Sequence, residues 1–268
     1  MKKFALIGKG IHKSFSPAIH SYCFDILCID AKYDIIDIDS SSKIISVINL
    51  LKNGKLDGIN ITSPYKKSFI KYIDQLNPRA ESIGSINCIH NNDSKLIGNN
   101  TDWFGFAKSI ENFKNYTNVV IIGAGGVVLP LIYYFKNRQS LSVHLVARDT
   151  SRIQSLNADN VYLHNIDDLN LDLQKCMIIN ATPAGAKIPW NSVIPKISST
   201  ALYALDLNYH LEATNFLNYY SSQTHIKNGL DMLIYQALMS IDIWFNENLS
   251  ASINFEDLKN NINELYYK

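Results

Sequence analysis

The sequence predicts an α/β fold with two domains. The first hundred residues alternate strand-like and helix-like segments, and a second alternation of this kind begins at residue 118. The last forty residues contain two amphipathic segments and no strand. The first alternation indicates a mostly parallel sheet with helices on its faces, and the second indicates a doubly wound parallel sheet. The strandless tail is expected to pack elsewhere, back on the first domain.

Hydrophobic spacing defines the elements of the first domain. We expect helices at 16–29 and 41–54, because Ile19, Cys23 and Ile26 recur at helical spacing and Gly54 supplies a stop. Ser16 and Pro17 are expected as the N-cap and first residue of the earlier helix. Strands are expected at 3–8, 31–39 and 56–62, followed by a hairpin of 86–90 and 95–99 around NNDS.

The second domain begins with NVVIIGAGG at 118–126, where an apolar strand enters a glycine turn. A helix at 127–137 follows, and further strands are expected at 140–148, 160–166, 175–185 and 202–209. The tail helices are expected at 230–245 and 255–267. The predicted domains are therefore 1–102 and 103–229, with 230–268 returning to the first.

Composition narrows the function classes. The chain has 268 residues, of which 47% are hydrophobic and 18% charged, as in a globular protein. A net charge of +1 argues against nucleic acid and an anionic membrane surface as partners, and no segment approaches the ~18 apolar residues of a membrane span. The apolar run after MKK stops at Gly8, which favours a strand over a signal peptide. Four cysteines without metal-ligand spacing predict no metal and a cytoplasmic protein with reduced thiols. The sequence leaves a homodimer open.

The glycine turn predicts a phosphate-binding site. In GAGG the backbone N–H groups at the start of a helix would meet a pyrophosphate, although Val128 stands where a third glycine is usual. After the next strand, Arg148 and Arg152 are spaced by one helical turn, which suits a 2′-phosphate. Asp149 beside them is compatible with plain NAD. NADP(H) is favoured as the cofactor.

Small hydroxyl and amide side chains gather at strand ends of the first domain. They are Ser14, Ser16, Asn60, Thr62, Asn87 and the polar residues of GNNTDWFGF at 98–106. Such groups suit a polyhydroxylated small molecule, whose hydroxyls need partners once buried. Each has a structural alternative: Ser16 as a helix cap, Asn99 and Asn100 as a turn, and Asp102 as the cap of a helix beginning at Trp103.

Eight motifs give the chain a family resemblance. They are SFSPAIH, NITSPYK, SINCI, GNNTDWFGF, GAGG, INATPAG, DLNY and NGLDMLIYQ. In order and spacing the chain resembles shikimate dehydrogenases along nearly its whole length. The resemblance implies NADPH-dependent reduction of 3-dehydroshikimate to shikimate, on the route to chorismate and the aromatic amino acids. It also implies an N-terminal substrate domain, a Rossmann-like cofactor domain, and C-terminal helices that return to the substrate domain.

The resemblance also implies roles for individual residues. Lys66 and Asp102 would be the catalytic pair. The substrate would be held by Ser14, Ser16, Asn60, Thr62, Lys66, Asn87, Asp102, Tyr209 and Gln236. The cofactor would contact Gly123, Ala124, Gly125, Gly126, Val127, Ala147, Arg148, Asp149, Arg152, Leu207 and Gly229. The run Ala147-Arg148-Asp149 departs from the Asn-Arg-Thr usual in the family.

A lysine beside a ketone can stabilise the developing alkoxide and donate a proton to it. Asp102 is expected to orient Lys66 and a substrate hydroxyl. Lys67 is the internal control, because it is equally charged and points about 100° away if the segment is helical. The alternatives are an NAD-linked quinate or dual quinate/shikimate dehydrogenase, a non-catalytic shikimate sensor, and an unrelated two-domain dehydrogenase for an amino acid or folate.

Overall fold

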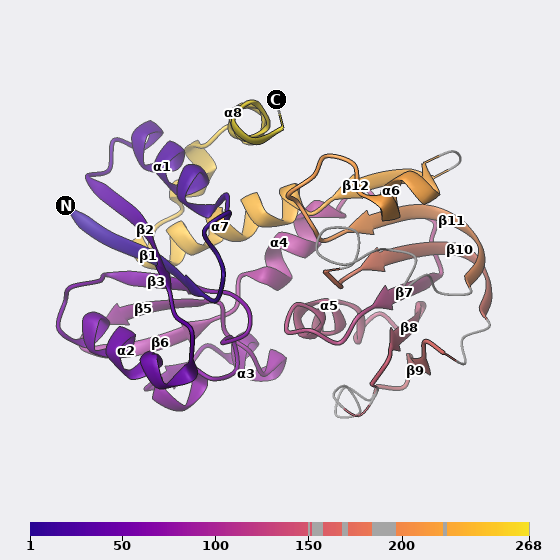
Figure 1. The fold of residues 1–268 in the computed structure, drawn as a ribbon, viewed down its shortest axis with the longest axis horizontal. Coiled ribbons are helices and arrows are strands. Elements are labelled where there is room, and N and C mark those ends of the chain that lie inside the picture. Colours follow the sequence, from indigo (N-terminus) through magenta and orange to yellow (C-terminus); the bar gives the residue numbers. More distant parts are fainter. Residues whose placement is uncertain (150, 152–157, 168–170, 184–196, 222–223, 268) are drawn as a thin grey trace. The chain divides into compact units, whose positions relative to one another are not determined.

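The computed structural model describes residues 1–149, 151, 158–167, 171–183, 197–221 and 224–267. Arg152 lies outside these residues. The chain forms two compact units (Figure 1). Unit 1 comprises Met1–Phe106 and Leu233–Tyr266, and unit 2 comprises Ala107–Met232 and Tyr267. The C-terminal helices therefore return to the N-terminal unit, as the sequence predicts.

The sheet of unit 1 has six strands in the order β2-β1-β3-β5-β6-β4. These strands are β1 (Lys2–Gly8), β2 (Ala31–Asp37), β3 (Gly58–Ile61), β4 (Gln75–Leu76), β5 (Cys88–Asn92) and β6 (Lys95–Asn99). Neighbouring strands are parallel except where β5 pairs antiparallel with β3 and β6. The predicted hairpin is confirmed, and Asp93 and Ser94 form its turn with positive φ. The two-residue strand β4 was not predicted.

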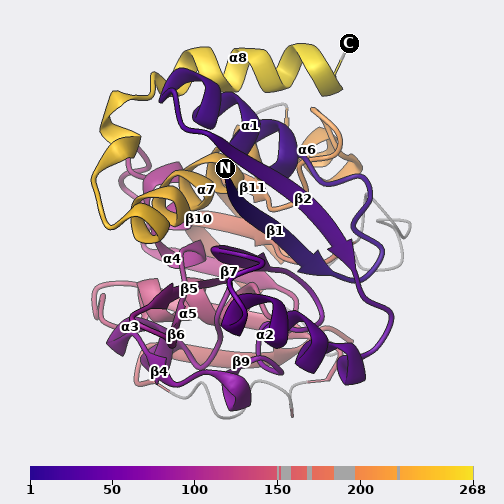
Figure 2. The same cartoon turned by 90° about the vertical axis from the view of Figure 1, so that its left-hand side faces the viewer.

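The helices of unit 1 cover both faces of this sheet (Figure 2). They are α1 (Ser16–Ile26), α2 (Ile44–Lys52), α3 (Pro78–Ile83), α4 (Asp102–Ser109, running on into unit 2), α7 (Leu230–Phe245) and α8 (Phe255–Tyr266). The buried face of α2 joins one core cluster with Ile7, Ile59 and Ile61. The N-cap of α1 is Phe15 and makes no side-chain cap bond, so the prediction that Ser16 caps this helix is wrong.

Helix α7 packs on the other face of the sheet, because Phe4 and Gly58 alternate with the residues that face α2. The Trp244 ring stacks on Phe4 at 4.4 Å, and its indole N–H donates to the Ile89 carbonyl at 3.1 Å. A Cβ on Gly58 would lie 2.5 Å from the Trp244 ring nitrogen, so only glycine permits this approach. Trp244 thus fixes the register of α7 on unit 1.

Unit 2 contains the predicted doubly wound sheet. Its strand order is β12-β11-β10-β7-β8-β9, with every neighbouring pair parallel. The strands are β7 (Asn118–Ile122), β8 (Ser142–Ala147), β9 (Val161–Asn165), β10 (Leu171–Asn180), β11 (Ile197–Asp206) and β12 (His225–Asn228). Helices α5 (Val128–Phe135) and α6 (Asn215–Tyr220) accompany it. The order of the strands in the sheet changes direction between β7 and β10. Ligands of such folds bind at this position, at the carboxyl ends of the strands.

Across the described residues, no helix has the length and apolar character that crossing a bilayer requires.

Candidate active site

The centre of the candidate site is a buried ion pair in unit 1. The Lys66 Nζ lies 2.6 Å from Asp102 Oδ2, and the two side chains are only 12% and 8% exposed. Lys66 sits in a turn after β3 and not in a helix, while Asp102 opens α4. A lysine shielded in this way keeps one N–H on the carboxylate and has two more to offer.

Neighbouring residues hold the Lys66 turn in place. The Tyr65 ring is buried, and its hydroxyl donates to the Ile38 carbonyl at 2.8 Å. The Lys66 carbonyl accepts from the Ile86 N–H at 3.1 Å, which ties this turn to the segment that carries Asn87. Both contacts anchor the backbone, so the Lys66 side chain starts from a fixed point.

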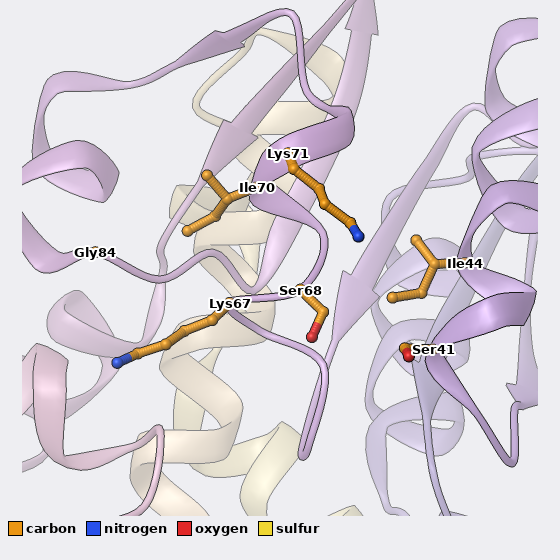
Figure 3. Close-up of a pocket in the computed structure, with 7 residues that line it drawn as sticks. All are labelled: Ser41, Ile44, Lys67, Ser68, Ile70, Lys71 and Gly84. Carbon is orange, nitrogen blue, oxygen red and sulfur yellow. The ribbon is translucent and has the colours of Figure 1, made fainter. Parts of the chain in front are cut away.

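Lys67 behaves differently from Lys66. Its side chain is exposed and lines a surface pocket of about 410 Å³ (Figure 3). The pocket is lined by Ser41, Ile44, Lys67, Ser68, Ile70, Lys71 and Gly84. None of these seven residues was predicted as a site residue. Lys67 is therefore a suitable control for Lys66.

The Asp102 carboxylate does not serve as a helix cap. Its Oδ1 accepts from Asn87 Nδ2 at 2.9 Å, and its Oδ2 accepts from Lys66. The Asp102 backbone N–H donates instead to the Asn100 side chain at 3.1 Å, and Asn100 donates to the Ser85 carbonyl and hydroxyl. Asn100 thus takes the structural role, and the Asp102 carboxylate is engaged by Lys66 and Asn87.

Asn87 links the ion pair to α7. Its two N–H groups have their shortest contacts, both 2.9 Å, with Asp102 Oδ1 and the Thr101 hydroxyl. Its Oδ1 accepts from the Thr101 N–H at 2.6 Å. The Gln236 Oε1 lies farther away, at 3.3 Å from Asn87 and 3.4 Å from Thr101. Because Gln236 Nε2 donates once, to the Leu233 carbonyl, Gln236 retains one N–H for a ligand.

The Asn60 side chain makes its hydrogen bonds to other residues of unit 1. Its Nδ2 donates to the Ser240 hydroxyl at 2.9 Å and to the Asn87 carbonyl at 3.2 Å, and its Oδ1 accepts from the Tyr33 hydroxyl at 2.9 Å. Both N–H groups of this buried amide are therefore engaged. Asn60 has no N–H left for a ligand in this arrangement.

Ser14 lies on the loop between β1 and α1, and Ser16 is the first residue of α1. The Ser14 hydroxyl contacts Ser16 Oγ at 3.2 Å and accepts from the Ser16 N–H at 3.3 Å. Asp37, at the end of β2, fixes the start of this loop by accepting from the N–H groups of Gly10 and Ile11. These backbone hydrogen bonds lower the pKa of the Asp37 carboxyl. The Thr62 methyl group and Ile11 both border Gly8, so Thr62 lies at the base of the loop.

His20, left unassigned by the sequence, is a core residue of unit 1. It is fully buried and stacks on Tyr33 with ring centroids 4.0 Å apart. Burial lowers its pKa to about 3, and the nearby Asn60 side chain opposes this shift. His20 is therefore neutral at ordinary pH.

In unit 2 the predicted phosphate turn joins β7 to α5. Gly123 has φ +131°, and a Cβ there would lie 2.9 Å from the Ala181 carbonyl oxygen. Ala124, Gly125, Gly126 and Val127 complete the turn, and a Cβ on Gly125 would meet nothing within 4 Å. Val128, in place of the third glycine, is the first residue of α5 and is fully buried. The turn thus leaves open backbone at the start of a helix, which fits a pyrophosphate.

The end of β8 carries the predicted ribose-phosphate residues. Ala147 is the last residue of the strand, and Arg148 and Asp149 follow it on the surface. The Asp149 carboxylate accepts from the backbone N–H and the hydroxyl of Ser151. These two hydrogen bonds give Asp149 a structural role beside Arg148.

The structure brings Leu207 and Gly229 together. A Cβ on Gly229 would lie 2.3 Å from the Leu207 carbonyl oxygen, so the two backbones meet only because residue 229 is glycine. Nearby, the buried Asp206 carboxylate accepts from Asn180, Asn208 and Thr214. Burial raises the pKa of Asp206, and these hydrogen bonds oppose the shift.

Tyr209 follows β11 in unit 2, and its backbone carbonyl accepts from the Tyr267 hydroxyl. No group of three or more His, Cys, Asp or Glu suited to a metal ion occurs within the described ranges.

The fold and the site define a class: an enzyme with a doubly wound nucleotide-binding unit and an α/β unit that carries a buried lysine–carboxylate pair. The sequence profile of the shikimate dehydrogenase substrate binding domain matches residues 6–89. The NADP(+) shikimate dehydrogenase of Pelagibacter ubique is 36% identical over 91% of this chain and 93% of its own length. The chain belongs to the shikimate dehydrogenase family.

Solved structures agree with this assignment. Shikimate dehydrogenase 1 from Peptoclostridium difficile matches with a TM-score of 0.83 and 29% identity, covering 99% of this chain and 98% of that one. A shikimate dehydrogenase solved in complex with NADP+ also has a TM-score of 0.83, with 28% identity, and covers 100% of this chain and 96% of that one.

Three residues of the site region escaped the sequence reasoning: Tyr33, Thr101 and Ser240. Thr101 lies inside a quoted motif without an assigned role, and Tyr33 carries no local signal. Ser240 had a readable signal, since Gln236, Ser240 and Trp244 are spaced by four residues on one face of α7.

Proposed function

We propose that this protein is an NADP(H)-dependent shikimate dehydrogenase, which reduces 3-dehydroshikimate reversibly to shikimate with Lys66 as the acid/base. The buried Lys66–Asp102 pair, in a chain of this family, is the observation that carries the proposal. The reaction belongs to the route to chorismate and the aromatic amino acids. The free cysteines, of which three are buried, are compatible with a cytoplasmic enzyme.

Lys66 would act on the ketone oxygen at C3. The bound nicotinamide supplies the hydride for carbon. Lys66 has one N–H on Asp102 and two remaining, so its ammonium can stabilise the negative charge that develops on oxygen and then donate a proton. In the direction of shikimate oxidation the neutral amine would accept that proton.

Asp102 would orient the lysine and one substrate hydroxyl. Its two oxygens are already engaged by Lys66 and Asn87, so its position is fixed from two sides. A carboxylate accepts about four hydrogen bonds, so each oxygen keeps capacity for a substrate hydroxyl. Asn87 therefore supports the site by holding Asp102, whatever further contact it makes with the substrate.

The remaining substrate hydroxyls and the carboxylate would meet hydrogen-bonding groups of the other predicted substrate residues. Gln236 retains one N–H, and the Ser14 and Ser16 hydroxyls bond chiefly to each other. Thr62 lies at the base of the loop between β1 and α1, which carries Ser14. We assign these residues and Tyr209 to substrate binding and Asn60 to their support.

NADP(H) would bind unit 2. The glycine turn of residues 123–127 fits the pyrophosphate, and Arg148 and Arg152 would pair with the 2′-phosphate. Asp149 was the argument for NAD, and its hydrogen bonds to Ser151 weaken that argument because they give it another role. The relatives named for NADP(+) support the same choice. Leu207 and Gly229 would lie near the nicotinamide.

Initial rates at 340 nm test the proposal, with purified protein and shikimate or quinate, each against NADP and NAD. The proposal predicts turnover of shikimate with NADP that exceeds the other three combinations. Dominant turnover with quinate or NAD would assign the protein to the dual-specificity relatives instead. Folded protein that binds shikimate without turnover in all four reactions would be a sensor, and the proposed reaction would be wrong.

A further inference from the structure

We propose that Ser240 on α7 is a positioning residue for the Lys66–Asp102 pair and acts through the buried side chains of Asn60 and Thr101. The inference rests on the proposed function, because it concerns the same site. Its basis is a continuous chain of hydrogen bonds within unit 1 that runs from the middle of α7 to the ion pair.

Ser240 is fully buried, and its hydroxyl has three polar partners besides the Cys88 thiol. Its hydroxyl lies 2.9 Å from the Gln236 carbonyl oxygen one turn earlier, 2.9 Å from Asn60 Nδ2 and 3.3 Å from Thr101 Oγ1. A serine hydroxyl carries one proton and two lone pairs, so these three contacts use its whole capacity. The three partners come from α7, from β3 and from the segment before α4.

The donor in each contact follows from the chemistry of the partners. The Gln236 carbonyl only accepts, so it takes the Ser240 proton, and the Asn60 amide nitrogen only donates. The third contact then requires the Thr101 hydroxyl as donor. Thr101 in turn accepts from Asn87 Nδ2 at 2.9 Å, and the other Asn87 N–H goes to Asp102 Oδ1 at 2.9 Å.

The same chain has a second anchor. The Tyr33 hydroxyl donates to Asn60 Oδ1, and the Tyr33 ring is held by stacking on His20. The Asn60 amide is thereby held by two hydrogen bonds, with its Oδ1 accepting from Tyr33 and its Nδ2 donating to Ser240. Because Asn60 also donates to the Asn87 carbonyl, the amide fixes the Asn87 backbone as well.

Removal of the Ser240 hydroxyl leaves two buried donors without their acceptor. The Asn60 N–H would be unpaired, and the Thr101 hydroxyl would turn to Asn87 Oδ1 at 3.3 Å or Gln236 Oε1 at 3.4 Å. Either choice disturbs the amide that holds Asp102. A buried donor left without an acceptor changes an equilibrium constant by roughly tenfold or more. We therefore expect kcat of Ser240→Ala to fall about tenfold. The KM for NADP should stay unchanged, because this residue lies in unit 1.

The experiment compares wild type, Ser240→Ala, Ser240→Thr, Tyr33→Phe and the double variant Ser240→Ala/Tyr33→Phe by initial rates, pH profile of kcat and thermal unfolding. Ser240→Thr keeps the hydroxyl and should recover part of kcat. Tyr33→Phe should lower kcat less than Ser240→Ala. The double variant should lose less than the product of the two single losses, since both act through Asn60. The pH profile of kcat should shift in Ser240→Ala because the surroundings of Lys66 change.

Ser250→Ala is the matched control. It removes a partly buried hydroxyl, on the segment after α7, that donates to Asp242 of α7 at 2.6 Å, away from the chain to Asp102. It should lower thermal stability and leave kcat unchanged. If Ser240→Ala keeps kcat and pH profile within twofold of wild type while it loses stability as Ser250→Ala does, the positioning role is refuted and the proposed function stands. Should Ser240→Ala fail to fold, unchanged kcat in Tyr33→Phe refutes the role equally. Wild-type protein without dehydrogenase activity refutes the proposed function itself.

Discussion

Replacement of Lys66 by methionine separates the proposed proton donor from the rest of the site. Methionine retains the length of the side chain and removes the ammonium. The Asp102 carboxylate then loses its partner at 2.6 Å and keeps only the amide of Asn87. Lys67→Met removes the same charge from the next residue, whose side chain is exposed in the pocket of Figure 3.

The geometry sets the size of both effects. Loss of a positioned general acid typically lowers a rate by about 10²–10⁴-fold, so we expect kcat for Lys66→Met to fall at least about 100-fold. Breaking a buried ion pair costs about 3–5 kcal/mol of stability. The Asn87 hydrogen bond remains, so the value for Lys66→Met should lie at about 3 kcal/mol, the lower end of that range. Lys67→Met should change stability by less than about 0.5 kcal/mol, as surface substitutions usually do.

The assay is shikimate-dependent reduction of NADP at 340 nm, with urea unfolding of each variant at pH 7. Substrate titration by calorimetry separates lost binding from lost turnover. Comparable losses of kcat from Lys66→Met and Lys67→Met would refute the reasoning about this turn. Lys66→Met with near wild-type kcat would show that another group supplies the proton.

Three further predictions follow from the surroundings of the site. Asp37→Asn should raise the KM for shikimate roughly threefold or more, because a neutral acceptor holds the loop between β1 and α1 less firmly than a carboxylate does. Asp34→Asn on the same strand should leave this KM unchanged, and initial rates of both variants test the prediction. Gly123→Ala should lower the free energy of unfolding by about 1–3 kcal/mol, because residue 123 has φ +131°, and Gly125→Ala should lower it less, as thermal unfolding without NADP would show. His20 has its pKa lowered from 6.5 to about 3 by burial, so below pH 6.5 the unfolded chain takes up a proton that the folded chain does not, and stability falls with pH. Urea unfolding of wild type should therefore show a loss of about 2 kcal/mol between pH 6.5 and 4.5 that His20→Leu lacks, and equal losses in both would contradict the assignment.

The sequence predicted the architecture wherever hydrophobic periodicity was strong. The strand before the glycine turn, the amphipathic helix α2 and the hairpin of β5 and β6 were all readable, because each depends on local spacing. The short strands β4 and β12 were not, since two to four residues give no period and their pairing depends on distant strands. The Ser16 cap failed because Ser-Pro marks a helix start only to within a residue, and Phe15 took the cap position.

The contact between Lys66 and Asp102 was predictable from the sequence, and the hydrogen bonds around it were less so. The Lys66–Asp102 pair followed from the family motifs, and the structure places the two side chains in contact. The orientation of the Asn60 amide toward the core did not follow, because it depends on Tyr33 and Ser240, which are 27 and 180 residues away in the chain. The contact with Ser240 depends on how α7 returns to unit 1, and the contact with Tyr33 depends on how β2 and β3 are placed around β1. No local sequence pattern encodes either arrangement.

The most direct test of hydride transfer to 3-dehydroshikimate uses NADPH in which both hydrogens at C4 of the nicotinamide are replaced by deuterium. The protein is incubated with 3-dehydroshikimate and the labelled cofactor, and the product is analysed by mass spectrometry. The account predicts shikimate that carries one deuterium, bound to C3. Shikimate without deuterium, or no shikimate from folded protein, would contradict it.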